Sequence, residues 1–388
     1  MKKSDNRNWQ ELVENAVRIR KELHQIPEPA WEEFGTASFI QTQLDAMGVS
    51  WKRCTETGIV ASIAPQKKGE HLGFRADMDG LRLHEQNDAW YRSTHPQVMH
   101  GCGHDGHMAV LLAVVNWLNR HQDRLEGPVT FIFQPAEEGG HGAREMIKHG
   151  ALEGVDRIFG WHNWPAIPLG SGVCPEGPLM AANGSFVIRV KGSGGHASQP
   201  ELCRDPVLAG AAITLALQQI VSRNLSPQTP GVVSVTSFDG RSGATIIPEA
   251  VTLQGSVRLG AEGEMGKIGK AIESIATSIA AGYNTSAEVK FTPRYPAVIN
   301  SRDEARRFAG CLAEGFGEHY FRSEIELPIM ASEDFSYYLA EIPGAFALIG
   351  AGDGGRYSVP CHNSCYDFND RLIEPMVRTL CLLAGVSF

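Results

Sequence analysis

The sequence predicts an α/β fold in which a mixed, largely parallel sheet, flanked by helices, is interrupted by a smaller inserted α+β domain. Up to about residue 182, strand-like apolar runs alternate with helical patterns, which is typical of a sheet whose functional residues gather at strand ends. Between residues 183 and 296 the order changes to β-α-β-β-α-β, the ferredoxin-like plan. From residue 297 the alternation of strands and helices resumes. We therefore expect one domain from residues 1–182 and 297–388, and an inserted domain from residues 183–296.

Each element is placed by apolar spacing and by glycine or proline at its ends. In the outer parts we expect helices over 8–25, 36–47, 108–119, 143–149, 302–316 and 371–384, and strands over 58–63, 73–75, 129–133, 155–160 and 345–349. In the insertion we expect strands over 185–190, 231–238, 251–258 and 287–291, and helices over 206–221 and 266–281. A polar turn over 330–335 is expected to open a further helix, with Ser332 as its N-cap.

Composition excludes several classes of function. The 388 residues carry a formal net charge of −9, which argues against nucleic acid as the main partner, because a phosphate-binding face needs a basic surplus. No apolar run is long enough to span a membrane, and the polar N-terminus lacks the apolar core of a signal peptide. The eight cysteines are widely spread, which favours reduced thiols and a cytoplasmic protein.

The chemistry concentrates in the stretch MHGCGHDGHM, residues 99–108. Cys102 and His104 are a soft sulfur ligand and an imidazole two positions apart, a combination that suits zinc or a similar transition metal. Glycines between them let the backbone fold tightly around a small group. Any one of these residues alone would be unremarkable in a histidine-rich loop, so the interpretation depends on a second stretch.

That second stretch is the strand 129–133 with the residues that follow it, where Glu137 and Glu138 stand side by side. Neighbouring side chains at a strand end diverge, so the two carboxylates can serve different centres. His162 follows another predicted strand. Asp77 and Asp79 occupy alternate positions after a third, where they either form a hydrophilic turn or orient metal-bound imidazoles.

Two further histidines leave the choice between structure and function open. His196 lies in a Gly-Gly-His turn of the insertion, where it is either a turn residue or a group held out toward a site. His362 lies between Cys361 and Cys365, which are either related to a metal site or, as we expect, buried structural cysteines.

Taken together, these motifs resemble the M20 metallopeptidase clan, and within it the amidohydrolase branch of aminoacylases, hippurate hydrolases and auxin-conjugate hydrolases. The resemblance runs nearly end to end, through RADMDGL, MHGCGHDGHMA, FIFQPAEEGGHGAREM, WHNWP, GGHAS, IIPEAVTLQGSVR, MASEDFS and CHNSCYDFND. It is most specific where the Cys-Gly-His loop is combined with the Gln-Pro-Ala-Glu-Glu turn.

The resemblance implies a catalytic domain with two divalent metal ions, zinc or manganese with nickel or cobalt as options, and an inserted lid that supports a homodimer or a higher oligomer. The implied metal ligands are Cys102, His104, Glu138, His162 and His362. The implied catalytic groups are Glu137 and, from the lid, His196, acting within its own subunit or across the dimer. Arg258 is expected to meet a substrate carboxylate, and Asn300 aligns with an asparagine near the lid hinge.

Three positions depart from the family pattern without removing a ligand. Arg82 replaces the usual proline, Glu201 replaces a common histidine, and residues 245–248 read Thr-Ile-Ile-Pro. Two of the three lie in the lid, so they bear on substrate choice and not on the reaction. Glu201 suggests a weaker hypothesis, in which it pairs with a cationic substrate side chain, against the alternative of a solvated surface glutamate.

The function expected from these residues is hydrolysis of the amide bond of a small N-acyl, and first of all N-acetyl, amino acid. In this scheme a metal polarises the carbonyl and activates water, and Glu137 moves the proton. Three alternatives remain: a carboxypeptidase or dipeptidase using the same site, a non-catalytic metal-dependent binding protein, and a structural zinc protein. Glu137 argues against the last two, because neither needs a spare carboxylate.

Overall fold

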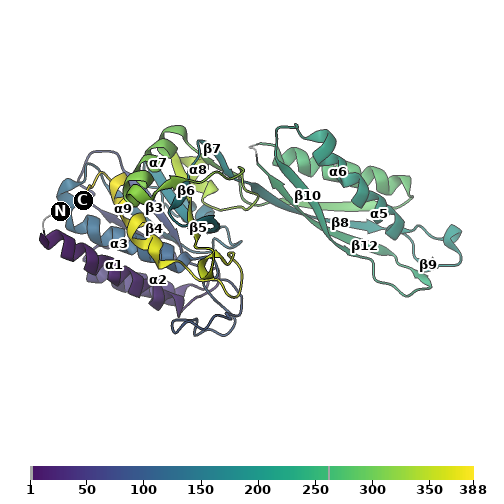
Figure 1. Cartoon of the computed structure of the whole chain (residues 1–388). Coiled ribbons are helices and arrows are strands. Elements are labelled where there is room, and N and C mark those ends of the chain that lie inside the picture. Colours follow the sequence, from purple (N-terminus) through teal and green to yellow (C-terminus); the bar gives the residue numbers. More distant parts are fainter. Residues whose placement is uncertain (1–2, 261–262) are drawn as a thin grey trace. The chain divides into compact units, whose positions relative to one another are not determined.

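The computed structural model describes residues 3–260 and 263–388, which form two compact units (Figure 1). The first unit contains the chain up to Gly177, Ile299–Ile325 and Asp334–Phe388. The second contains Pro178–Val298 and the short segment Glu326–Glu333. The sequence-based boundaries, 182/183 and 296/297, lie within a few residues of two of these junctions, and residues 326–333 were placed with the outer part. No helix among the described residues is both long and apolar enough to cross a membrane.

An eight-stranded mixed sheet forms the centre of the first unit, in the order β1-β2-β4-β3-β5-β16-β6-β15. The strands are β1 (Ser50–Arg53), β2 (Ile59–Ile63), β3 (Leu72–Asp77), β4 (Val129–Gln134), β5 (Arg157–Pro168), β6 (Ser171–Val173), β15 (Phe321–Arg322) and β16 (Gly344–Gly352). The four strands β4, β3, β5 and β16 run parallel to one another, while β1, β2 and β6 make the antiparallel pairs. The expected largely parallel sheet is confirmed for this central part.

Helices cover both faces of that sheet. They are α1 (Lys3–His24), α2 (Phe34–Ala46), α3 (His104–Arg120), α4 (Gly142–Lys148), α7 (Arg302–Phe316), α8 (Ser336–Glu341) and α9 (Ile373–Leu383). On one face α3 packs between α1 and α9, and α9 packs against α7 (Figure 1). The alternation along β16 shows the two faces: Ala345 and Ala347 belong to the core cluster with α3 and α9, whereas Phe346 packs against Phe335 beside α8.

The second unit has the expected β-α-β-β-α-β order. Its main elements are β8 (Ala182–Lys191), α5 (Pro206–Leu217), β10 (Gly231–Asp239), β12 (Ala250–Leu259), α6 (Met265–Gly282) and β13 (Ser286–Pro293). The short strands β9 (Gly195–His196) and β11 (Ile246–Ile247) pair in a separate sheet. The antiparallel sheet has the order β10-β12-β8-β13, and α5 and α6 pack against it. Along β8, Phe186, Ile188 and Val190 are buried, while Val187 is exposed, so the helices cover one face of the sheet. The ferredoxin-like plan is confirmed.

Two local expectations are wrong in ways that matter for the site. Helix α3 begins at His104, four residues before the predicted start at Met108, because Gly103 takes a left-handed conformation (φ 96°) at the N-cap. Strand β5 continues to Pro168, so His162 lies within a strand and not at its end. His104 and His162 therefore both lie on regular elements, a helix and a strand.

A third expectation, the Ser332 cap, is also wrong. Helix α8 begins at Ser336, with Phe335 at the N-cap and no side-chain capping bond. The sequence around it offered several polar residues and no apolar periodicity to fix the boundary. The strands that were not predicted, such as β1, β6 and β15, have two to four residues each, too few for alternation to be recognised.

Candidate metal centre and active site

The first unit brings together the five residues that the sequence proposed as metal ligands. Cys102 Sγ lies 3.3 Å from His162 Nε2 and 3.4 Å from His362 Nε2. His362 Nε2 lies 3.0 Å from Glu138 Oε1, and the ligand atoms of Cys102, His104 and Glu138 all lie within 4.8 Å of one another. Four separate chain segments therefore meet at one cluster of sulfur, nitrogen and oxygen atoms.

Backbone geometry around the cluster requires glycine. Gly103 separates Cys102 from His104, and a Cβ at Gly103 would lie 2.2 Å from Asn163 Oδ1. Because glycine permits this close approach, Cys102 lies just before helix α3 and His104 is its first residue. Both side chains therefore reach the same cluster. His362 is positioned by a turn in which its own φ is 65° and its N–H donates to the carbonyl of Gly101 at 2.8 Å.

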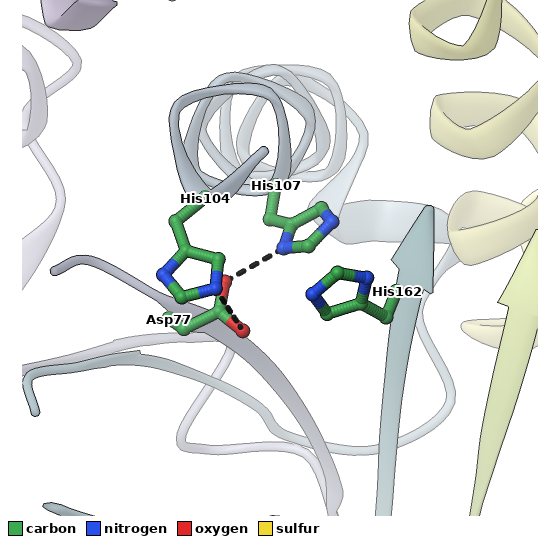
Figure 2. A group of neighbouring side chains, drawn as sticks. All are labelled: Asp77, His104, His107 and His162. Carbon is green, nitrogen blue, oxygen red and sulfur yellow. Dashed lines mark hydrogen bonds and ion pairs between the residues drawn. The ribbon is translucent and has the colours of Figure 1, made fainter. Parts of the chain in front are cut away.

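A buried carboxylate orients the imidazoles of the cluster (Figure 2). Asp77, the last residue of β3, accepts a hydrogen bond of 2.7 Å from His107 Nδ1, and its other oxygen lies 3.6 Å from His104 Nε2. His107 Nε2 lies 2.8 Å from Asn163 Oδ1. Both nitrogens of His107 are thus engaged, which gives His107 a supporting role beside the ligands. Sequence reasoning did not assign His107 or Asn163; the helical spacing of His104 and His107 was the available indication.

The donor atoms fit a transition-metal ion. His104 Nε2 and Glu138 Oε1 are buried without a hydrogen-bond partner, and the 3.0 Å approach of His362 Nε2 to Glu138 lacks hydrogen-bond alignment. Two of the converging donor atoms therefore lack a partner that a shared cation would supply. Sulfur, imidazole and carboxylate together suit zinc and its neighbours. The side chain of His362 is 56% exposed, so the cluster is open to solvent on that side.

The charges around the cluster make the binding of a cation dependent on pH. Burial disfavours an ionised Glu138, but His362 and His104 outweigh burial and lower the pKa of this carboxyl. Cys361 and burial hold the pKa of the Cys102 thiol well above its usual range. Burial alone would lower the pKa of His104, yet Asp77 and Asp79 raise it to about 10. A cation entering here must displace protons from Cys102 and His104, so its affinity rises with pH.

The loop that carries the glutamate pair is held by two further carboxylates. Asp79 accepts hydrogen bonds from the main-chain N–H of Glu137 (3.0 Å) and of Glu138 (2.9 Å). Glu33 accepts one from Ala136 N–H (2.9 Å), and Ala136 has a left-handed φ of 56°. Burial and the neighbouring Asp79 raise the pKa of Glu33 to about 7. A non-glycine residue in that conformation costs about 1–2 kcal/mol, so the bonds are needed to keep the loop in place.

Three predicted site residues belong to the second unit. His196 is exposed on the short strand β9 (Gly195–His196), and its Nδ1 lies 2.7 Å from Ser198 Oγ. Glu201 is exposed in a 3-10 turn. Arg258 is half-buried on β12, and its Nε donates to the carbonyl of Met330 at 3.1 Å. Burial and a nearby arginine lower the pKa of Arg258. Their roles toward a substrate stay predictions.

Asn300, the fourth of the residues predicted to lie near substrate, is buried in the first unit. Its Nδ2 donates to the carbonyls of Pro175 (3.1 Å) and Phe346 (2.9 Å), and its Oδ1 accepts from Phe346 N–H (2.8 Å). The amide therefore satisfies main-chain groups next to β16. Both amide hydrogens are thus used within the first unit, and the role of Asn300 toward a substrate stays a prediction.

A mixed α/β unit that gathers these donor atoms beside a second buried glutamate, with a ferredoxin-like insertion, defines a metal-binding hydrolase. The chain belongs to the peptidase M20 family: residues 73–385 match the family described as Peptidase family M20/M25/M40. This confirms the resemblance drawn from the motifs.

Relatives within the family act on amide bonds. The chain is 36% identical over 344 residues to the N-acetyl-L-cysteine deacetylase of Bacillus subtilis, covering 88% of this chain and 82% of the relative. It is 36% identical over 361 residues to the hippurate hydrolase of Campylobacter jejuni (92% of each chain). It is 32% identical over 383 residues to the thermostable carboxypeptidase 1 of Saccharolobus solfataricus (96% and 95%).

A solved structure agrees with the fold and with the kind of site. The Bacillus subtilis protein described as a dinuclear metal-binding peptidase of the M20 family superposes with a TM-score of 0.83 at 30% identity, covering 97% of this chain and 98% of that one. The chain is therefore an M20-family amide hydrolase with a candidate metal centre at Cys102, His104 and Glu138.

Proposed function

We propose that this protein hydrolyses the amide bond of an N-acyl amino acid, with N-acetyl amino acids as the first class to test. The observation that carries the proposal is the pair Glu137 and Glu138: the second joins the ligand cluster, while the first is buried next to it on a loop fixed by Asp79. Relatives named as a deacetylase and a hippurate hydrolase support this substrate class.

Cys102, His104, Glu138, His162 and His362 would hold two divalent cations, which supply a Lewis acid for the amide carbonyl and increase the acidity of water. Glu137 then takes a proton from the attacking water as its oxygen bonds to the carbonyl carbon. Glu137 returns that proton to the amide nitrogen as the C–N bond breaks, releasing a carboxylate and a free amino acid. Proton transfer of this kind contributes roughly 10²–10⁴ to the rate.

The second unit would supply substrate recognition. Arg258 offers a guanidinium fork suited to an α-carboxylate, and His196 would donate a hydrogen bond to the developing oxyanion, from its own subunit or from the partner in a dimer. Glu201 would favour a cationic substrate side chain; preference for hippurate over acetyl-ornithine would discard that role. A homodimer built through the second unit is part of the proposal.

The donor set supports zinc or manganese as the working metal, with nickel or cobalt as alternatives. We propose a cytoplasmic location, because all eight cysteines are free thiols in the described part of the chain. A carboxypeptidase or dipeptidase is the second candidate, supported by the carboxypeptidase relative.

The test is a panel of substrates on chelated protein reloaded with one metal at a time. N-acetyl amino acids, hippurate and free dipeptides should be compared by the release of amino acid. Higher kcat/KM for the acylated amino acids supports the proposal. Higher kcat/KM for dipeptides would instead identify the protein as a carboxypeptidase or dipeptidase. No hydrolysis with any metal would reject both candidate functions.

A further inference from the structure

A second buried aspartate connects the two ends of the loop that carries Glu137 and Glu138. Asp334 accepts hydrogen bonds from Gln134 Nε2, at 2.9 Å to Oδ1 and 3.0 Å to Oδ2, just before the loop. It also accepts one from Ala143 N–H, at 2.9 Å, just after the loop. Asp334 is completely buried. One carboxylate thus sets the separation of the loop's two ends.

A buried arginine links that carboxylate to the aspartate that orients the imidazoles. Arg75 donates from Nη2 to Asp334 Oδ1 (3.0 Å), from Nε to Gln134 Oε1 (2.8 Å) and from Nη1 to Asp77 Oδ2 (2.7 Å). Asp77 in turn accepts from His107 (2.7 Å). The glutamate loop and the histidine side of the cluster are therefore joined through one guanidinium, whose fork holds three acceptors in fixed directions.

The position of Asp334 is itself fixed by packing. The next residue, Phe335, is completely buried and lies against Phe346, with ring centroids 4.9 Å apart. It also covers Gly160 of β5, where a Cβ would lie 2.6 Å from the Phe335 ring. Asp334 is thus held by the sheet, although the segment just before it, residues 326–333, belongs to the second unit.

Asp334 is close to the reacting carboxylate without being one of the implied ligands. One of its carboxylate oxygens lies within 4.8 Å of a carboxylate oxygen of Glu137. We propose that Asp334 and Arg75 are positioning residues: through Gln134, Ala143 and Asp77 they hold Glu137 in register with the metal-binding imidazoles. This inference rests on the proposed role of Glu137 as the proton carrier. The competing explanation is a buried ion pair that stabilises the fold and nothing more.

The two explanations predict different kinetics. If Asp334 and Arg75 position Glu137, they act mainly on the proton-transfer step. Their loss then lowers kcat and leaves KM nearly unchanged. Misplacement of a reacting group by about 1 Å can cost about 10²-fold in rate. For Asp334→Asn and for Arg75→Lys, which keep size or charge but not the full set of bonds, we expect kcat to fall about 10- to 100-fold with KM within about threefold.

The experiment compares these two variants with Glu304→Gln, which weakens another ion pair of the first unit, the 2.7 Å contact between Glu304 and Arg157. Steady-state kinetics on the best substrate of the panel and metal content are measured for each. Hydrogen exchange of residues 135–143 is followed in both the metal-free and the metal-loaded protein. We expect faster exchange in that loop and a lower kcat for Asp334→Asn and Arg75→Lys, with neither change in Glu304→Gln.

Failure of this inference can be told apart from failure of the proposed function by including Glu137→Gln. If Glu137→Gln keeps full activity, the proposed role of Glu137 is wrong. If Glu137→Gln is inactive but Asp334→Asn keeps its kcat, or raises only KM, the positioning role is overturned. Unchanged exchange in residues 135–143 of folded Asp334→Asn would overturn it as well, whatever the substrate.

Discussion

The side chain of Asp79 accepts a hydrogen bond of 3.0 Å from the main-chain N–H of Glu137. Its main-chain carbonyl accepts another, of 2.8 Å, from His104 Nδ1. One buried residue therefore fixes both the proposed proton carrier and the orientation of an implied metal ligand. The tautomer of His104 follows from this contact, because Nδ1 carries the proton and Nε2 is free to face a cation.

Asp79→Asn should lower kcat while leaving the fold intact. An amide has one acceptor oxygen, so the N–H of Glu137 or of Glu138 would lose its partner, at about 1–3 kcal/mol. We expect kcat to fall at least about tenfold. Steady-state kinetics alongside urea unfolding check this, and an unchanged kcat in a folded variant would show that the loop does not need Asp79.

Glu137→Gln and Cys102→Ser should fail in different ways. Glu137→Gln removes the proton carrier but no ligand, so we expect full metal content with activity lowered about 10²–10⁴-fold. Cys102→Ser removes the sulfur ligand, so we expect metal to be lost on dialysis. Elemental analysis of both variants separates these outcomes; metal loss from Glu137→Gln would mean that Glu137 is a ligand.

Arg258→Ala tests recognition of a substrate carboxylate. If the guanidinium binds that group, KM should rise about tenfold or more for N-acyl amino acids, since a charge-assisted hydrogen bond contributes about 1.5–3 kcal/mol. The corresponding N-acyl amino acid amides, which lack the charge, should be affected much less. Equal changes for both series would remove this role from Arg258.

Metal removal should destabilise the first unit. The cluster contains buried donor atoms without partners, His104 Nε2 among them, and a cation that satisfies them binds only the folded state. At a free metal concentration 100 times its Kd, the gain is about 2.7 kcal/mol. Thermal unfolding with and without chelator measures it, and Cys102→Ser should show a much smaller difference between the two conditions.

Stability should also fall at alkaline pH because of His24. Burial opposes a charged His24, but Asp105 and Glu85 outweigh it and raise its pKa from 6.5 to about 9. A raised pKa means that the folded state holds the proton more tightly. The stabilisation is complete below about pH 6.5 and is lost as the pH rises through about 9.

We expect a loss on the order of 1–3 kcal/mol in the free energy of unfolding between pH 7 and 9.5 from this group. Urea titrations of the metal-free protein measure it. Because the raised pKa of His104 gives a slope of the same sign, the slope should become smaller by this amount in His24→Gln, and it should be unchanged in His95→Gln, which changes an exposed histidine. A slope of unchanged size in His24→Gln would assign the pH dependence to other groups.

Much of the architecture was predictable because it follows from the periodic spacing of apolar residues along the chain. The long elements, such as α1, α7, β8 and β12, show regular apolar spacing over eight or more residues. The start of α3 was not predictable, because Gly103 and the histidines around it carry no apolar pattern. The five implied ligands were recognisable as residue types in known motifs, whereas the supporting residues, His107, Arg75 and Asp334, lie in the same motifs but had no role assigned to them.

The sequence by itself determined the fold class, the family and the set of side chains available for chemistry, because these depend on patterns within short segments. Only the tertiary structure decided which of those side chains act on one another. Asp334 lies 200 positions from Gln134, yet they bond at 2.9 Å, and nothing in the local pattern of either segment encodes that contact. Such pairings arise when the sheet and its helices pack. Packing brings polar side chains from distant segments into one buried site, where each needs a hydrogen-bond partner.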